Sequence, residues 1–263
     1  MKHIILFEDY QGIYEYIDFI LCDTNEKLSS QTIIDKFNLV LNKIKDFSDN
    51  RKRKILTYLI SSILSMTSIN DVIKSVNHVR DPMLIQITNQ MQSKYKDPTE
   101  LSISENGEYN IKKFEKIRLK AYEVSYKHKK KKITDKKITI GYGHAEPVKT
   151  SRFRVGDVID IRTANNLFKE DINKTHKYLQ HIFKEWKREG VDIKLTQNQY
   201  DAIMSVAFNV GGSALKRSEF MNHVKNGDFE TAAEKLLTTR VSKKFPGLSI
   251  RRQSEADLFL SSM

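Results

Sequence analysis

A glutamate, a threonine and a glycine-rich turn lie close together in the chain and form a combination that can perform acid catalysis. Glu115 lies in the segment Lys112 to Tyr122, and Thr139 opens the sequence Thr-Ile-Gly-Tyr-Gly-His, which ends at His144. A carboxyl at the rim of a hydrophobic surface can stay protonated near neutral pH and donate a proton to a leaving oxygen. Closely spaced glycines let the backbone approach a bulky ligand. Together these elements indicate acid catalysis on a polymer that lies in a cleft.

The same residues resemble the active-site segment of phage lysozymes of the T-even type, glycoside hydrolase family 24, which includes endolysins and tail lysozymes. Two later motifs resemble this family as well. Leu195 to Gly211 contains Leu-Thr-Gln-Asn-Gln-Tyr-Asp-Ala and Ala-Phe-Asn-Val-Gly, and Phe245 to Ala256 contains Phe-Pro-Gly-Leu and Arg-Arg-Gln-Ser-Glu-Ala. The resemblance covers about residues 101–263, whereas residues 1–99 match no family that we can name. It implies an α+β, mostly helical, lysozyme-like domain with a small β-hairpin sheet.

The N-terminal region is predicted to be a separate small helical domain. Apolar residues recur at helical spacing from Ile33 to Ile44 and from Ile55 to Leu64, and helix starts are indicated at Ser29-Ser30, Asn70-Asp71 and Asp81-Pro82. Three to five helices would pack as a small bundle. The polar stretch 94–107 contains Pro98 and has little periodicity, so we divide the chain into residues 1–99 and 100–263.

The C-terminal region is predicted to alternate between helices and one small sheet. A helix over 110–120 would carry Glu115, and two strands would follow, joined by a lysine-rich loop. Further expected elements are strands over 121–125 and 137–140, a long helix that Asp160 or Thr163 caps, a central apolar helix over 197–209, and helices near 218–225, 229–237 and 248–260.

Charge and cysteine content narrow the class of protein. The net charge is +12, and because residues 1–100 are balanced, the whole excess lies in the C-terminal region. Such a region would concentrate at an anionic surface. The single cysteine excludes an intramolecular disulfide. No secretory signal opens the chain, so we expect a protein made in the host cytoplasm that acts at the host cell wall, either released at lysis or carried in the virion.

The resemblance implies roles for two of these residues. Glu115 matches the family's general acid, and Thr139 matches the threonine that helps to hold the attacking water beneath the sugar. Outside this context, Glu115 would be a helix-face residue that pairs with Lys112 or Arg118, each three positions away. Thr139 would be an ordinary strand threonine. The combination of motifs favours the catalytic interpretation of both.

The second carboxylate departs from the family's pattern. The family usually has Asp nine positions after the glutamate, where this chain has Val124. Glu123 is adjacent, but one residue along a strand reverses the side-chain direction, so a bulge would be needed to aim it at the substrate. Asp135 could fold back from the lysine-rich loop. Of the two we predict Glu123 as the second catalytic carboxylate.

Other residues are predicted to support the site or bind substrate. The resemblance implies a structural pair of His144 with Asp171, and it places Arg251 near the acid helix. The turn residues Gly141 and Tyr142 are predicted to contact substrate. Asn209 either faces the saccharide, as the amide does in relatives, or caps the helix end before Gly211. No second His or Cys lies at ligand spacing, so neither a metal nor a cofactor is expected.

The function that the resemblance implies is that of a muramidase, which cleaves the β-1,4 bond between N-acetylmuramic acid and N-acetylglucosamine in peptidoglycan. The loop Lys127 to Lys132 could bind anionic wall polymers or be a solvated hairpin tip. Residues 1–99 could dock in a virion or bind the wall or another protein. The alternative is a wall-binding or virion structural protein that has lost its second catalytic carboxylate. The valine at position 124 favours this alternative. Nucleic-acid binding is not expected, since no reading helix or stacking motif is recognisable.

Overall fold

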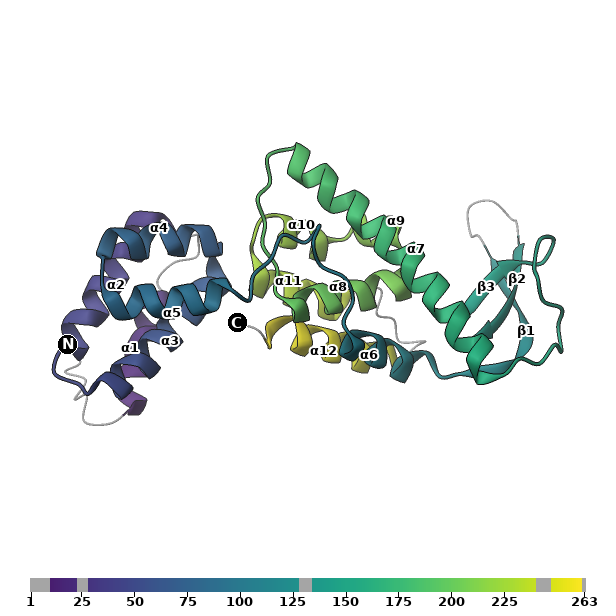
Figure 1. Cartoon of the computed structure of the whole chain (residues 1–263), viewed down its shortest axis with the longest axis horizontal. Coiled ribbons are helices and arrows are strands. Elements are labelled where there is room, and N and C mark those ends of the chain that lie inside the picture. Colours follow the sequence, from purple (N-terminus) through teal and green to yellow (C-terminus); the bar gives the residue numbers. More distant parts are fainter. Residues whose placement is uncertain (1–9, 23–27, 128–133, 240–246, 262–263) are drawn as a thin grey trace.

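Two large hydrophobic clusters divide the chain, and a third, smaller one (Ala121, Ile138, Ile140 and Leu167) joins the sheet to the helix beside it. One of the two large clusters runs from Ile13 to Tyr95 and the other from Leu101 to Phe259. The structure, a computed structural model, describes residues 10–22, 28–127, 134–239 and 247–261. The helical bundle lies at one end of the molecule and a small sheet at the other (Figure 1). Because the clusters part between residues 95 and 101, we keep the division at residues 99 and 100 as a proposal.

The N-terminal residues form a bundle, as predicted. Five helices belong to it: α1 (Tyr10–Cys22), α2 (Ser30–Ile44), α3 (Asp49–Met66), α4 (Ile69–Val79) and α5 (Pro82–Gln92). Side-chain caps fix three of their starts, because Ser29, Ser68 and Asp81 accept hydrogen bonds from backbone N–H groups in the first turns. Pro82 occupies the first turn of α5, where its missing N–H costs no intrahelical hydrogen bond.

The sheet has three antiparallel strands in the order β1-β2-β3, one more than the sequence predicted. They are β1 (Arg118–Lys127), β2 (Thr134–Gly141) and β3 (His144–Pro147). The third strand follows because Gly143, at a φ of 85°, turns the chain back so that Ile140 pairs with His144. The strand β3 has too few residues for an alternating pattern to reveal it in the sequence.

The helix that carries Glu115 is shifted from its predicted range of 110–120. α6 (Glu105–Glu115) begins where Ser104 accepts a hydrogen bond from the backbone N–H of Gly107. It ends at Glu115 because Lys116 has a φ of 49°, outside the helical region. Of the later apolar residues that fit a helical spacing, Ile117 precedes β1 and Leu119 lies within it. Glu115 is therefore the last residue of its helix.

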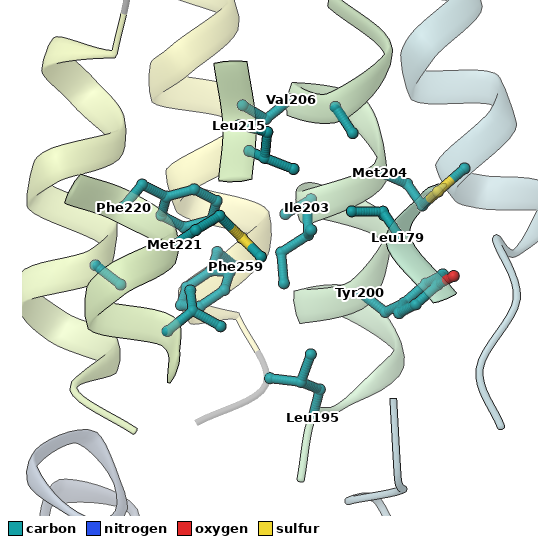
Figure 2. Packing of buried hydrophobic residues seen from close by; sticks show 14 of the residues in the cluster. Leu179, Leu195, Tyr200, Ile203, Met204, Val206, Leu215, Phe220, Met221 and Phe259 are labelled. Atoms are coloured by element: carbon teal, nitrogen blue, oxygen red, sulfur yellow. The ribbon is translucent and has the colours of Figure 1, made fainter. Parts of the chain in front are cut away.

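A central helix, α8 (Gln197–Val210), organises the rest of the C-terminal part, by which we mean residues 100–263. It begins with a capping box between Thr196 and Gln199 and is buried along most of its length, as its apolar sequence predicts. Around it pack α7 (Ile161–Arg188), α9 (Gly212–Lys216), α10 (Glu219–Lys225), α11 (Phe229–Thr238) and α12 (Gly247–Leu260). Figure 2 shows Ile203 and Met204 of α8 in this core, together with Phe220 and Phe259. Asp160 caps α7, and α9 was not predicted.

Candidate active site

Glu115 is held by an arginine from the far end of the chain. Its Oε1 accepts a hydrogen bond of 2.5 Å from Nη1 of Arg251, and its side chain is 19% exposed. The alternative partners are engaged elsewhere: Lys112 donates to Asn165, and the guanidinium of Arg118 lies over the ring of Tyr122. The structure therefore brings Glu115 and Arg251 together rather than pairing the glutamate along its own helix.

The glycine turn lies against the other oxygen of the same carboxyl. A Cβ atom added at Gly143 would lie 3.4 Å from Oε2 of Glu115, and the φ of 85° at this position favours glycine. Gly141 has a φ of 66°. Between them, Tyr142 stacks edge-on against Phe168, with ring centroids 5.5 Å apart. Gly143 thus brings backbone, without a side chain, up to the carboxyl, whereas Gly141 lies against Ala164 of α7.

Thr139 presents a hydroxyl without a protein partner. Its side chain is only 6% exposed, and Oγ1 is buried with no hydrogen bond among the described residues. Thr139 pairs with Tyr122 across the antiparallel strands, so these two side chains and Val124 share one face of the sheet. A buried hydroxyl normally has a partner, and a bound water or a ligand oxygen would supply one here.

The two predicted substitutes for the second carboxylate do not lie at the site. Glu123 pairs with Ile138, so its side chain is on the opposite face of the sheet from Thr139, where it forms an ion pair of 2.8 Å with Lys136. The prediction that Glu123 is the second catalytic carboxylate needed a bulge to turn its side chain toward the site. The strands pair without a bulge from Tyr122 to Lys127, so the structure does not support that prediction. Asp135 shares the face of Thr139 but lies four residues away along β2, about 13 Å at the usual rise of a strand.

Arg251 belongs to a buried network of charges. Its Nε donates to Oε1 of Glu255 over 3.0 Å, and its Nη2 donates to the carbonyl of Ser205 over 3.2 Å. The hydroxyl of Ser205 also donates to Glu255. All three side chains are almost fully buried. Because the guanidinium is fixed from behind, its remaining donors point to Glu115 in a defined direction.

Arg252, the next residue, extends this network to Asn209. It is fully buried and donates to both Glu255 and the side-chain oxygen of Asn209. The helix end at Gly211 is closed by a backbone hydrogen bond from Gly211 to Ala207. Asn209 therefore does not cap α8 with its side chain.

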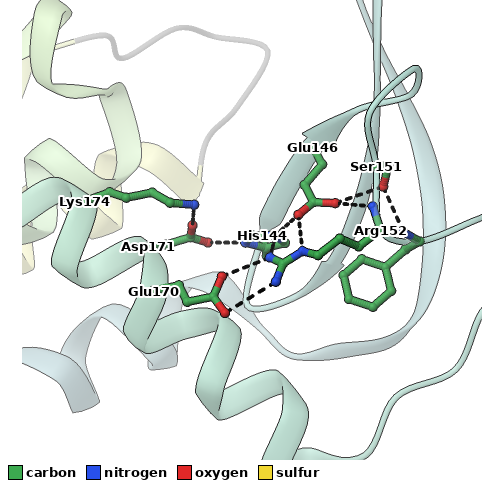
Figure 3. A network of polar contacts seen from close by, with 8 residues as sticks. His144, Glu146, Ser151, Arg152, Glu170, Asp171 and Lys174 are labelled. Atoms are coloured by element: carbon green, nitrogen blue, oxygen red, sulfur yellow. Dashed lines mark hydrogen bonds and ion pairs between the residues drawn. The ribbon is translucent and has the colours of Figure 1, made fainter.

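His144 lies in a second polar network, which braces β3 against α7 (Figure 3). Its Nδ1 is 2.8 Å from Asp171, its Nε2 is 3.0 Å from Glu146, and the ring is 2% exposed. The hydrogen bond with Asp171 raises the pKa of His144 against the opposing effect of burial. Burial opposes the ionised form of Glu146 too, but hydrogen bonds from His144 and Arg152 lower the pKa of Glu146 to about 2.

Sequence reasoning missed Ser205, Arg252 and Glu255 of the first network, and it missed Glu146 and Arg152 of the second. The spacing of Arg251 and Arg252 from Glu255, four and three residues, was a usable signal for helical ion pairs. The lysine-rich loop predicted to contact wall polymers lies outside the described residues except for the backbone of Lys127, which ends β1. Among the described residues no group of three or more His, Cys, Asp or Glu side chains could hold a metal ion.

Comparison with known proteins gives a consistent set of matches over the C-terminal part. The family model described as phage lysozyme matches residues 112–255. The chain is 34% identical over 168 residues to an endolysin of Acyrthosiphon pisum secondary endosymbiont phage 1, covering 62% of this chain and 100% of that protein. It is also 34% identical to an endolysin of Bacillus phage B103, of which it spans about half (55%), over 61% of its own length. A solved mutant of P22 lysozyme is similar with 33% identity and a TM-score of 0.43, covering 61% of this chain and 99% of that one.

Proposed function

This chain belongs to the phage lysozyme family, a family of peptidoglycan-degrading hydrolases, and from this premise we propose that it cleaves the β-1,4 bond between N-acetylmuramic acid and N-acetylglucosamine. The observation that carries the proposal is the placement of Glu115. Its carboxyl ends a helix, is held on one oxygen by buried Arg251, and has the other oxygen facing Gly143. A carboxyl in such a place can reach the oxygen of a bound glycan chain.

Glu115 acts as the general acid in this proposal. It protonates the glycosidic oxygen as the bond to the sugar carbon breaks. Arg251 orients the carboxyl, and Glu255, a carboxylate shared by Arg251 and Arg252, holds Arg251 in place from behind. Holding a catalytic group in its reactive orientation lowers the activation free energy, because less conformational entropy is lost on the way to the transition state.

Thr139 holds the water that attacks the sugar carbon. The unpartnered Oγ1 supports this role, because a hydroxyl can accept from a water and donate to it. Inverting glycosidases usually add a second carboxylate about 6.5–9.5 Å from the acid. Here Val124 occupies the expected place, and the undescribed segment 128–133 contains no Asp or Glu. We therefore assign catalysis to Glu115 and Thr139 without a second carboxylate.

The setting in which the enzyme works is part of the proposal. Curated relatives are phage endolysins, which supports action on the host cell wall, either at lysis or during penetration. No described helix has the length and apolar character needed to span a membrane. We propose that residues 1–99 form a docking domain, since the bundle has its own hydrophobic cluster and lies outside the matched residues.

The test is loss of turbidity of purified peptidoglycan by wild type and Glu115→Gln. The variant keeps the shape of the side chain but cannot serve as the acid, so its rate should fall by about 100- to 10,000-fold. Glu105→Gln, at the exposed start of the same helix, is the matched control and should lyse like wild type. Glu123→Gln should also remain active.

A different outcome would favour the second candidate, a wall-binding or virion structural protein without catalysis. Val124 is the observation in its favour. A wild type that sediments with peptidoglycan but releases no reducing sugar ends would support it and overturn the muramidase proposal.

A further inference from the structure

A groove lies between α7 and the segment that links the bundle to the C-terminal part. The side chain of Gln180 donates hydrogen bonds to the backbone carbonyls of Pro98 and Leu101, over 3.0 and 3.2 Å, and so holds this segment against the helix. The groove has a volume of about 570 Å³, which is within the range of small-molecule sites, about 300–1,000 Å³. The family match begins at residue 112. One wall of the groove, residues 99–102, therefore precedes the matched residues.

Two lysines of α7 line this groove. Lys177 and Lys184 are seven residues apart, so they lie on one face of the helix, about 10 Å apart along its axis. Both side chains are exposed, and within the part of the chain that the structure describes neither makes a hydrogen bond or an ion pair. Two ammonium groups on one face attract an anion.

The carboxylates nearby do not neutralise these lysines. Glu100 is the one carboxylate on the described lining of the groove, and it acts electrostatically on Lys187, which lies outside the groove. Glu185 follows Lys184 directly but forms an ion pair with Lys216. The positive charge of the two lysines is therefore left for a ligand.

His176 adds a neutral donor to the same groove. Its Nδ1 lies 2.8 Å from the hydroxyl of Tyr200, which is fully buried. Burial raises the pKa of Tyr200 to about 12, so the hydroxyl keeps its proton and donates it to Nδ1. Burial and the charge of Lys184 lower the pKa of His176, so its ring is neutral at pH 7. A neutral imidazole that accepts at Nδ1 carries its own proton at Nε2, and this N–H is the donor that His176 can offer to a ligand.

We propose that this groove binds a phosphate monoester, with Lys177 and Lys184 as the charged contacts and Nε2–H of His176 as the neutral donor. Near pH 7 such an ester carries close to two negative charges and three acceptor oxygens. It therefore matches two ammonium groups better than a carboxylate does. The volume also favours an ester over a bare ion, since one water occupies only about 30 Å³. The inference does not depend on the proposed catalytic activity.

The experiment measures binding of glycerol 3-phosphate to the intact protein by calorimetry, at pH 7 and moderate salt. Glycerol, which lacks the phosphate, should not bind measurably. Lys184→Gln should raise the dissociation constant for glycerol 3-phosphate about tenfold, because it removes a hydrogen bond between two charged groups. His176→Asn keeps an acceptor oxygen near the place of Nδ1, so Tyr200 keeps its partner, but it lacks the donor at Nε2. Its dissociation constant should rise about fivefold.

Lys169→Gln is the matched control. Lys169 is exposed on the same helix but does not line the groove, and its replacement changes the net charge equally. Its dissociation constant should stay within about twofold of wild type, because salt screens a charge at that distance. Thermal unfolding of each variant separates a binding effect from loss of structure.

Vesicles that contain phosphatidic acid present the same group on a membrane and identify its source. Sedimentation with these vesicles that Lys184→Gln abolishes would assign the phosphate to a lipid headgroup. Binding of glycerol 3-phosphate without sedimentation would assign it to a soluble or wall-borne ester. Either result supports the proposal.

Failure of the wild type to bind either probe would overturn the inference, as would equal losses in Lys184→Gln and Lys169→Gln. Lysis of purified peptidoglycan should be the same in Lys184→Gln as in wild type. A wild type that binds glycerol 3-phosphate but does not lyse peptidoglycan would leave this inference intact and overturn the muramidase proposal.

Discussion

The bundle and the C-terminal part bury different kinds of polar side chain. In the bundle, the buried polar residues among those described are hydroxyl-bearing, namely Thr67, Ser75 and Thr88. In the C-terminal part they include charged residues and a histidine: His144, Asp201, Arg251, Arg252 and Glu255. Burying a charge is costly unless it is paired and hydrogen-bonded, and apolar residues of similar size often stabilise a fold better.

The difference indicates where the chain must fix side chains and where it need only pack them. Each buried charge of the C-terminal part bears on the site or on its supports. Arg251 contacts Glu115, Arg252 contacts Asn209, and His144 braces the strand after the glycine turn. Asp201 accepts from the backbone of Ser104, where the helix of Glu115 begins. The buried polar side chains described in the bundle, by contrast, carry no charge.

The largest expected effect on stability comes from removing the carboxylate shared by the two buried arginines. Glu255→Ala leaves Arg251 and Arg252 without their common partner, and breaking a buried pair in this way costs about 3–5 kcal/mol. Urea denaturation followed by circular dichroism measures the loss. Ser75→Ala in the bundle is the comparison: its hydroxyl donates to the carbonyl of Asp71, and its loss should cost about 1 kcal/mol. Equal losses at the two positions would remove the contrast.

A cavity in the bundle tests whether the two parts are independent. Leu59 is fully buried in α3, and Leu59→Ala should destabilise the bundle by about 3 kcal/mol through lost packing. Because the site lies outside the hydrophobic cluster of the bundle, the initial rate of peptidoglycan lysis should be unchanged below the unfolding midpoint of the bundle. A parallel fall in lysis would mean that the bundle supports the site directly.

The pair of His144 and Asp171 should give a pH-dependent effect of about 2 kcal/mol, as expected for a hydrogen bond to a charged group. The pKa of His144 is raised in the folded state. The stabilisation is therefore complete below the ordinary histidine value of about 6.5 and is lost as pH rises through the raised value. Asp171→Asn should thus lower the free energy of unfolding most at pH 5 and least at pH 9.

The control for this change is Asp228→Asn, which breaks the more exposed pair with His223. An exposed pair should cost less than about 1 kcal/mol. If both variants lost the same free energy at pH 5, burial would not be the source of the effect at His144.

Elements with local signals were predictable from the sequence, and elements set by distant contacts were not. The Asp160 cap of α7 and the apolar α8 have such signals, and both agree with the structure. The end of α6 has no such local signal, because Lys116 ends the helix within an apolar pattern that continues at helical spacing. Gly107 inside α6 has a tertiary reason: a Cβ there would lie 2.7 Å from Cγ of Asp201.

The residues of the candidate site also differ in how far the sequence could predict them. Glu115, Thr139 and the glycine turn belong to nearly contiguous motifs, so their types and order could be recognised. The place of Glu123 depended on strand register, which puts it opposite Ile138 on the far face of the sheet. The partner of Asn209 depended on the packing of α12 against α8, which no local pattern encodes.

The smallest effect is expected at the junction of the two parts. Lys187 near the end of α7 is 65% exposed and donates to Asp97 in the linking segment over 2.7 Å. Burial opposes the ionised form, but hydrogen bonds from Lys187 and Thr99 lower the pKa of Asp97 to about 2. Any stability from this carboxylate is therefore present above its ordinary pKa of 3.8 and lost as pH falls toward 2.

Lys187→Gln should lower the free energy of unfolding only slightly at pH 7, and less at high salt, because an exposed pair is weak and screened. Thr99 still donates to Asp97 through its backbone and its hydroxyl, so the turn after the bundle keeps its shape. Urea denaturation at low and high salt measures the change. A salt-independent loss as large as that of Leu59→Ala would show that this contact couples the bundle to the C-terminal part, and the bundle could then no longer be called independent of it.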